Sequence, residues 1–87
     1  MRIKRHSKLT GIIQRVDLNC EGSITIPYEL MISNDIQVLE QVHVLNKNNG
    51  NRFITYAIEG EEFCLNGAAA RMGIVGDTVI LLTYHIE

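Results

Sequence analysis

The chain has 87 residues, of which 46% are hydrophobic and 21% charged, and its formal net charge at pH 7 is −2. This is the composition of one small globular domain; it excludes a disordered chain and argues against nucleic acid as the main partner. A chain of this size buries only about 60–65% of its unfolded surface, so self-association would add stability.

The N-terminal eight residues are rich in Lys and Arg, but no long apolar run follows them. A secretory signal needs such a run, and no stretch approaches the roughly 18 apolar residues that span a membrane. We therefore expect a cytoplasmic protein, with no membrane partner, in which Cys20 and Cys64 are reduced thiols.

Short runs of alternating apolar and polar residues predict half-buried strands. The first expected strand is residues 12–18. The second, residues 23–26, ends at Pro27, which lacks the N–H that a ladder needs. A short helix or turn is expected within residues 28–36, where Ser-Asn-Asp would end it.

An Asn-Gly pair within residues 47–51 predicts a hairpin, because these residues adopt the positive φ angles of a tight turn. The strands on either side are residues 42–45 and 52–58. His43 alternates with apolar neighbours in the first of them. We therefore expect its side chain to point to solvent.

A turn at residues 59–62 and a strand at 63–65 lead to a second helical segment. This short helix is expected over residues 67–72, with Asn66 as its N-cap and Gly73 as its left-handed stop.

The last expected strand, residues 78–84, is continuously apolar and predicts burial on both faces. Residues 40–44 weakly echo residues 77–81, since each is an acidic turn residue followed by an alternating strand. Short strands, two helical turns and a faint twofold repeat favour a small closed barrel.

Read from residue types alone, the candidates for chemistry are few. The cysteines and histidines lack metal-ligand spacing, so no metal is expected. The glycines match turns rather than a phosphate loop, and no nucleophile elbow of a hydrolase is present. Polar residues still occupy unusual positions: Glu21-Gly22-Ser23 precedes a strand, Thr55-Tyr56 lies within one, and Asn66-Gly67-Ala68 opens a helix. A turn, a cross-strand pair and a helix cap are the structural alternatives.

These motifs recur together in a known family. They are Asp17-Leu18 before Gly22-Ser23, then Asn49-Gly50-x-Arg52-Phe53-x-Thr55-Tyr56-Ala57-Ile58, then Asn66-Gly67-Ala68-Ala69-Ala70, then Gly76-Asp77-x-Val79-Ile80. In this order they resemble aspartate 1-decarboxylase, the pyruvoyl-dependent enzyme that makes β-alanine for pantothenate. The resemblance extends from about Lys8 to Tyr84. It implies a mainly β fold, with residues 1–87 as one small, closed, six-stranded double-psi β-barrel with short helices, assembled as a homotetramer.

The resemblance also implies that the chain cleaves itself between Gly22 and Ser23, into residues 1–22 and 23–87. The Ser23 hydroxyl would attack the Gly22 carbonyl, and β-elimination and hydrolysis would leave a pyruvoyl group on the larger fragment. Thr55 matches the residue that hydrogen-bonds this carbonyl. The pyruvoyl group generated from Ser23 would be the electron sink in place of pyridoxal phosphate.

The resemblance implies that L-aspartate is the substrate and gives further residues roles in binding it or acting on it. Tyr56 matches the proton donor, and Lys8 and Arg52 match the cations that hold carboxylates. Asn66-Gly67-Ala68 is assigned to substrate binding, since Asn66 matches an active-site asparagine. Each active site would lie at a subunit boundary, so Lys8 and Arg52 would approach Ser23 of a neighbouring chain.

The sequence departs from the family pattern at several places. Thr10 replaces a common histidine, Cys20 replaces a common tyrosine, the hairpin at residues 60–62 is short, and family members usually continue beyond the position of Glu87. We interpret Cys20 as a buried thiol that fills the place of the tyrosine rather than as a catalytic group.

Two alternatives follow from these departures: the same chemistry on another amino acid, or an uncleaved double-psi barrel with a structural or regulatory role. A processing-activator protein would be an additional partner. Nucleic-acid binding is disfavoured, because the basic N-terminal residues are not interleaved with aromatic ones.

Overall fold

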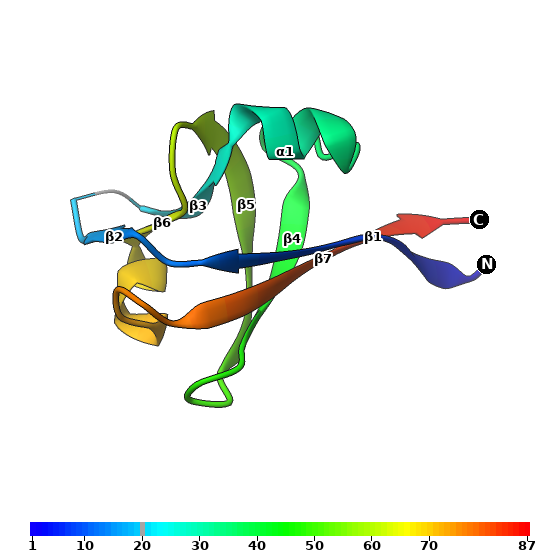
Figure 1. The fold of residues 1–87 in the computed structure, drawn as a ribbon. Coiled ribbons are helices and arrows are strands. Elements are labelled where there is room, and N and C mark those ends of the chain that lie inside the picture. The colour runs from blue at the N-terminus through cyan, green and yellow to red at the C-terminus, as the bar shows by residue number, and fades with distance from the viewer. Residues whose placement is uncertain (20) are drawn as a thin grey trace.

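The computed structural model describes residues 1–19 and 21–87, so Cys20 lies outside the described residues. The described part of the chain is mainly β, as expected, and its helix is confined to two short segments (Figure 1). The strands are β1 (Ile3–Ile12), β2 (Arg15–Asp17), β3 (Gly22–Pro27), β4 (Gln41–Asn46), β5 (Arg52–Gly60), β6 (Cys64–Gly67) and β7 (Thr78–Ile86), and the helices are α1 (Tyr28–Ser33) and the 3₁₀ helix η1 (Ala68–Met72).

All seven strands join in one sheet, in the order β1-β7-β4-β5-β3-β6-β2. Its two edge strands, β1 and β2, are consecutive in the chain and are separated only by Ile13 and Gln14. The Ile13 N–H donates to the carbonyl of Asp77, just before β7, and the Gln14 N–H donates to the carbonyl of Phe63, just before β6. We expected six strands in a closed barrel, whereas the sheet formed by residues 1–19 and 21–87 has seven strands and is not closed.

The predicted strand at residues 12–18 was misplaced, because it is split between the end of β1 and β2. Strand β1 pairs antiparallel with β7 from Ile3↔Ile86 to Ile12↔Thr78. Beyond the part of β7 that also pairs with β4, the two strands form an arm that carries both termini (Figure 1). Its residues are mostly exposed, so they lack the alternation that predicts a strand.

The hairpin between β4 and β5 is confirmed. Gly50 has a φ of 79°, and the Asn46 N–H donates to the Asn51 carbonyl at 2.8 Å. Strand β3 and helix α1 also lie where the sequence placed them. The segment at residues 60–62 is not a hairpin, because β6 pairs with β3 and β2 while β5 runs parallel to β3.

Two local predictions were wrong for tertiary reasons, and a third, the exposure of His43, is only partly observed. Asn66 does not cap η1, since its side chain is bonded to residues of β3 and Gly67 occupies the cap position. Gly73 is extended rather than left-handed, and an added Cβ would lie 2.8 Å from Asn46 Nδ2. His43 is half-buried, because the Tyr84 ring lies edge-on to it with centroids 4.7 Å apart.

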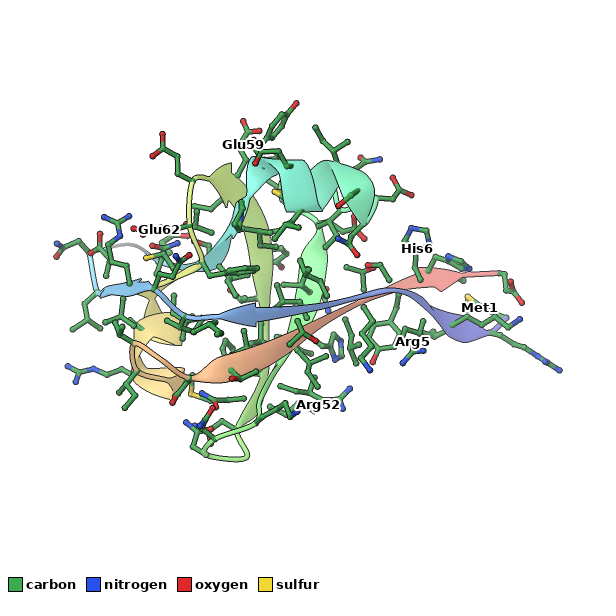
Figure 2. The ribbon with its side chains drawn as sticks, in the orientation of Figure 1. Met1, Arg5, His6, Arg52, Glu59 and Glu62 are labelled. Atoms are coloured by element: carbon green, nitrogen blue, oxygen red, sulfur yellow. The ribbon has the colours of Figure 1, made fainter. Side chains whose placement is uncertain are left out.

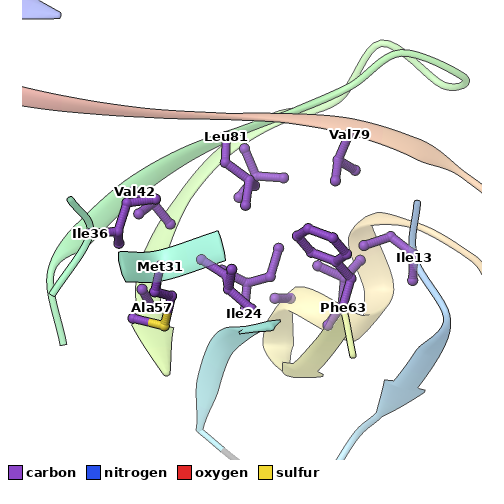
Figure 3. Close-up of a cluster of buried hydrophobic side chains, with 13 residues drawn as sticks. Ile13, Ile24, Met31, Ile36, Val42, Ala57, Phe63, Val79 and Leu81 are labelled. Carbon is purple, nitrogen blue, oxygen red and sulfur yellow. The ribbon is translucent and has the colours of Figure 1, made fainter. Parts of the chain in front are cut away.

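The core consists mainly of aliphatic side chains from the strands and their connections, together with Met31 of α1, Ala69 of η1 and the Phe63 ring (Figure 3). Its members are Ile13, Ile24, Ile26, Met31, Ile36, Val42, Val44, Ala57, Phe63, Leu65, Ala69, Val79 and Leu81. Strand β7 contributes its inner face to this core and is half-covered at Ile80 and Tyr84 on the outer face, so its predicted burial on both faces is only partly observed. Among the described residues, no helix is long and apolar enough to cross a membrane.

Candidate active site

The predicted cleavage position lies on a short antiparallel ladder between β3 and β6. Here Gly22 faces Gly67 and Ser23 faces Asn66. The Asn66 side-chain amide donates from Nδ2 to Ser23 Oγ at 3.0 Å. The Ala68 N–H donates to the Glu21 carbonyl at 3.2 Å, which extends the contact past the end of the ladder. The two motifs, 43 residues apart in the chain, therefore meet.

The backbone on the N-terminal side of Ser23 is one that glycine adopts readily. Gly22 has a φ of 157° and its partner Gly67 has a φ of 62°, and side-chain-bearing residues rarely occupy this half of φ space. A Cβ on Gly22 would lie 3.8 Å from the Ala68 Cβ. Conformation, rather than lack of space, thus requires glycine at the residue whose carbonyl would be attacked.

A pocket of about 350 Å³ opens beside Gly22. It is lined by backbone and side-chain atoms of β5, of η1 and of the segment before Ser23, namely Glu21, Gly22, Phe53, Ile54, Thr55, Tyr56, Ala68, Ala69 and Met72. Four residues of the predicted site, Gly22, Thr55, Tyr56 and Ala68, therefore surround one cavity. Its size is within the range of small-molecule sites.

Thr55 and Tyr56 are adjacent on β5, so their side chains leave opposite faces of the sheet. Thr55 is buried and Tyr56 is 52% exposed. In the described part of the chain, the Thr55 hydroxyl forms no hydrogen bond with the Gly22 carbonyl, although both residues line the pocket. Thr55 thus lines the same pocket as Gly22, but the predicted hydrogen bond from Thr55 to the Gly22 carbonyl is not formed in this structure.

Lys8 and Arg52 are exposed and do not line this pocket, although Arg52 directly precedes Phe53, which does. Arg52 begins β5, at the opposite end of the strand from Glu59 (Figure 2). Its Nη2 donates to Tyr84 Oη at 3.1 Å. Neither Lys8 nor Arg52 forms an ion pair within the described residues, so both remain available to a carboxylate.

The strand register shows which residues share the outer face, because it aligns residues of four neighbouring strands in rows. The rows are Lys8–Leu82–His43–Ile54 and Thr10–Ile80–Leu45–Arg52. Lys8, Arg52 and Thr10, which replaces the family's common histidine, therefore share one surface. The side chains between Lys8 and Arg52 are mostly apolar.

A polar network holds the end of η1 against the β4–β5 turn. The Met72 carbonyl accepts hydrogen bonds from the side-chain amides of Asn46 and Asn49, at 3.3 and 3.0 Å. Asn46 also donates to Asp77 Oδ2 at 2.8 Å, and the Ile74 N–H donates to the same oxygen at 3.0 Å. These donors, Asn46 first, lower the pKa of Asp77 below 3.8. The network supports the pocket wall that Met72 forms.

Sequence reasoning did not single out three residues that contact the predicted site. Tyr84 contacts Arg52, while Thr25 and Cys64 contact Asn66. A signal for the last two was present, since each lies two positions from a predicted site residue on a strand and therefore on the same face. Within residues 1–19 and 21–87, no group of three or more His, Cys, Asp or Glu side chains is placed to hold a metal ion.

Comparison with known proteins agrees with the resemblance read from the motifs. A family model described as aspartate decarboxylase matches residues 2–87. The chain is 48% identical to the aspartate 1-decarboxylase of Desulfotalea psychrophila, over 99% of this chain and 73% of the relative. It is 50% identical to that of Kosmotoga olearia, over 98% and 78%, and 53% identical to that of Thermoanaerobacter pseudethanolicus, over 87% and 68%.

Proposed function

The chain belongs to the aspartate decarboxylase family, and on this basis we propose that it converts L-aspartate to β-alanine and CO₂ in the cytoplasm, on the route to pantothenate. The cofactor is a pyruvoyl group generated from Ser23 by self-cleavage after Gly22. One observation carries this proposal: Asn66 holds the Ser23 hydroxyl at 3.0 Å, next to a glycine that lines a substrate-sized pocket.

Cleavage begins when Ser23 Oγ attacks the Gly22 carbonyl carbon. The new C–O bond replaces the C–N bond, and the hydroxyl proton ends on the freed Ser23 amine. Loss of the Ser23 α-proton then breaks the Oγ–Cβ bond, and Gly22 leaves as a carboxylate. The resulting enamine tautomerises, and water hydrolyses it to a pyruvoyl group and ammonia. Thr55 donates a hydrogen bond to the carbonyl oxygen as negative charge develops there, once that oxygen turns into the pocket.

The described residues fit this cofactor. Gly22 lines the pocket, and Ala68 and Ala69 are small side chains that leave room for a substrate near the start of β3. When formed, the pyruvoyl group supplies the electron sink for loss of CO₂. Tyr56, half-exposed at the same pocket, donates the proton that replaces the lost carboxylate. Asn66-Gly67-Ala68 forms the side of the substrate site next to Ser23.

The positions of Lys8 and Arg52 support an active site shared between subunits. Both cations lie on the outer face of the sheet, and neither lines the pocket of its own chain. A second copy that presents its pocket to this surface would bring the cations to the substrate carboxylates, and its contact would cover the apolar side chains between them. We therefore propose a homotetramer, together with the double-psi β-barrel of the family. A processing activator is a further partner that the cleavage assay tests.

Self-cleavage is tested by intact-mass analysis of the purified chain during incubation in buffer and in bacterial cell extract. We expect fragments of residues 1–22 and 23–87, the larger with a blocked N-terminus. Cleavage only in extract would indicate an activator. Ser23→Ala should remain whole, because it lacks the attacking hydroxyl. A wild-type chain that stays intact under both conditions would contradict the proposal.

Sharing of the site is tested by subunit mixing. Ser23→Ala cannot form the cofactor, and Arg52→Ala lacks the carboxylate-binding cation. Co-assembled from the two inactive variants, a tetramer should contain sites with both groups intact and regain activity. No recovery in tetramers verified to be mixed, or an active wild-type monomer in sedimentation, would contradict the shared site.

A further inference from the structure

Ser23 and Asn66 belong to a block of four polar side chains on one face of the β3–β6 ladder. The register pairs Ser23 with Asn66 and Thr25 with Cys64. Residues two apart on a strand share a face, so all four side chains lie together, and the intervening pair of Ile24 and Leu65 belongs to the core. Thr25, Cys64 and Asn66 are buried, so water does not readily satisfy their polar atoms.

The hydrogen bonds of this block converge on the side-chain amide of Asn66. Its Nδ2 donates to Ser23 Oγ at 3.0 Å and to Thr25 Oγ1 at 2.8 Å. The Cys64 thiol donates to Asn66 Oδ1, with sulfur and oxygen 3.1 Å apart. Both N–H groups and the oxygen of the amide therefore have partners, which fixes the plane of the amide and the end that faces Ser23.

Thr25 is itself held in one orientation by β5. A Cβ placed on Gly60 would overlap Cγ2 of Thr25, so the threonine methyl occupies the space that a larger residue would fill. Because Cγ2 and Oγ1 branch from the same carbon, packing of the methyl group also directs the hydroxyl. The absence of a side chain at Gly60 thus allows Oγ1 to face the Asn66 amide.

We propose that Thr25 and Cys64 are positioning residues for self-cleavage, which act by presenting the N–H end of Asn66 to the Ser23 hydroxyl. The inference rests on the proposed cleavage at Ser23. An N–H donor favours the negative charge that develops on Oγ as its proton leaves. The reversed amide would accept a hydrogen bond from the Ser23 hydroxyl, which holds its proton and favours the neutral form.

Each partner opposes this reversal in its own way. Sulfur is a weak hydrogen-bond acceptor, so an amide turned with its nitrogen toward Cys64 would leave buried N–H groups poorly satisfied. Thr25 takes the second N–H and prevents the amide from tilting away from Ser23. Loss of either partner leaves a buried polar group without a full set of bonds, which is costly.

The test compares cleavage rates of the full chain made by pulsed cell-free synthesis and followed by intact mass. Thr25→Val keeps the methyl packing and removes the acceptor, and Cys64→Ala removes the donor. We expect each to slow cleavage about 3- to 10-fold, the change in rate that one hydrogen bond provides. Cys64→Ser restores a donor and should cleave within about 2-fold of wild type. The double variant should be slowed by less than the product of the single effects, because both act through one amide.

The outcomes separate this inference from the function on which it rests. A wild-type chain that never cleaves would overturn the self-cleavage itself. A wild-type chain that cleaves, with Thr25→Val and Cys64→Ala at the same rate, would overturn only the positioning role. Equal slowing in Cys64→Ala and Cys64→Ser would assign the effect to side-chain volume and overturn the role of the thiol as a donor. Should Cys64→Ala fail to fold, the cleavage rates of Thr25→Val and Thr25→Ser are compared. Thr25→Ser keeps the hydroxyl and should cleave faster, and equal rates would overturn the positioning role of Thr25.

Discussion

Replacement of Arg52 tests the substrate preference most directly. The guanidinium donates to Tyr84 Oη at 3.1 Å and forms no ion pair among the described residues, so its removal should leave folding nearly unchanged. Charge-assisted hydrogen bonds to a buried carboxylate are worth about 1.5–3 kcal/mol each. Arg52→Ala should therefore raise the KM for L-aspartate about 10- to 100-fold. It should also narrow the difference in KM between L-aspartate and L-alanine, which lacks the second carboxylate.

Arg52→Lys and Tyr84→Phe are the matched controls. Lysine keeps the charge but loses the two-pronged geometry of the guanidinium, so an intermediate KM is expected. Tyr84→Phe removes only the hydroxyl that receives the Arg52 bond and should raise KM by less than Arg52→Ala does.

The assay is CO₂ release by fully processed enzyme over a panel of L-aspartate, L-glutamate and L-alanine. Glutamate places its far carboxylate one methylene further out and should be a poorer substrate than aspartate. An unchanged aspartate KM in Arg52→Ala would refute the carboxylate-binding role. A processed enzyme that ignores aspartate but decarboxylates another amino acid would refute the substrate assignment and support the alternative of a related amino acid.

Three further predictions concern catalysis, packing and pH. Tyr56→Phe should still be processed but lose about 10²–10⁴-fold in turnover, as measured by CO₂ release, because it lacks the proton donor. Gly11→Ala should destabilise the fold by about 1–3 kcal/mol in urea unfolding, because its Cβ would overlap the Phe63 ring. Since the pKa of Asp77 is lowered in the folded state, its stabilising effect should be present above pH 3.8 and lost on acidification through the lower folded pKa.

Each of these has a result that would count against it. Normal turnover in Tyr56→Phe would exclude the phenol as donor. Wild-type stability in Gly11→Ala would mean that the Phe63 ring moves without cost. For the pH effect, thermal unfolding of Asp77→Asn should depend less on acid than wild type does, and identical pH profiles would contradict the assignment.

The β4–β5 hairpin and strand β3 were predictable because short-range rules govern them. Asn-Gly prefers the backbone of a tight turn whatever surrounds it, and Pro27 ends a ladder because it lacks an N–H. All of strand β1 except its last residue, Ile12, was missed, for the opposite reason. Its exposed half pairs with β7, and nothing in its own residues reports a partner more than 70 positions away.

The features of the candidate site also divide into those that local sequence predicts and those that only the tertiary structure decides. The motifs identified the family and singled out Ser23, Thr55 and Tyr56 as expected catalytic residues and Asn66 as an expected substrate-binding residue, because those residue types and spacings are local features of the chain. The tertiary structure decided that Asn66 bonds Ser23 rather than capping η1, and that Lys8 and Arg52 share the outer face of the sheet without lining the pocket of their own chain. Such contacts depend on which strands pair and in which register, and that choice is made by the packing of the whole core.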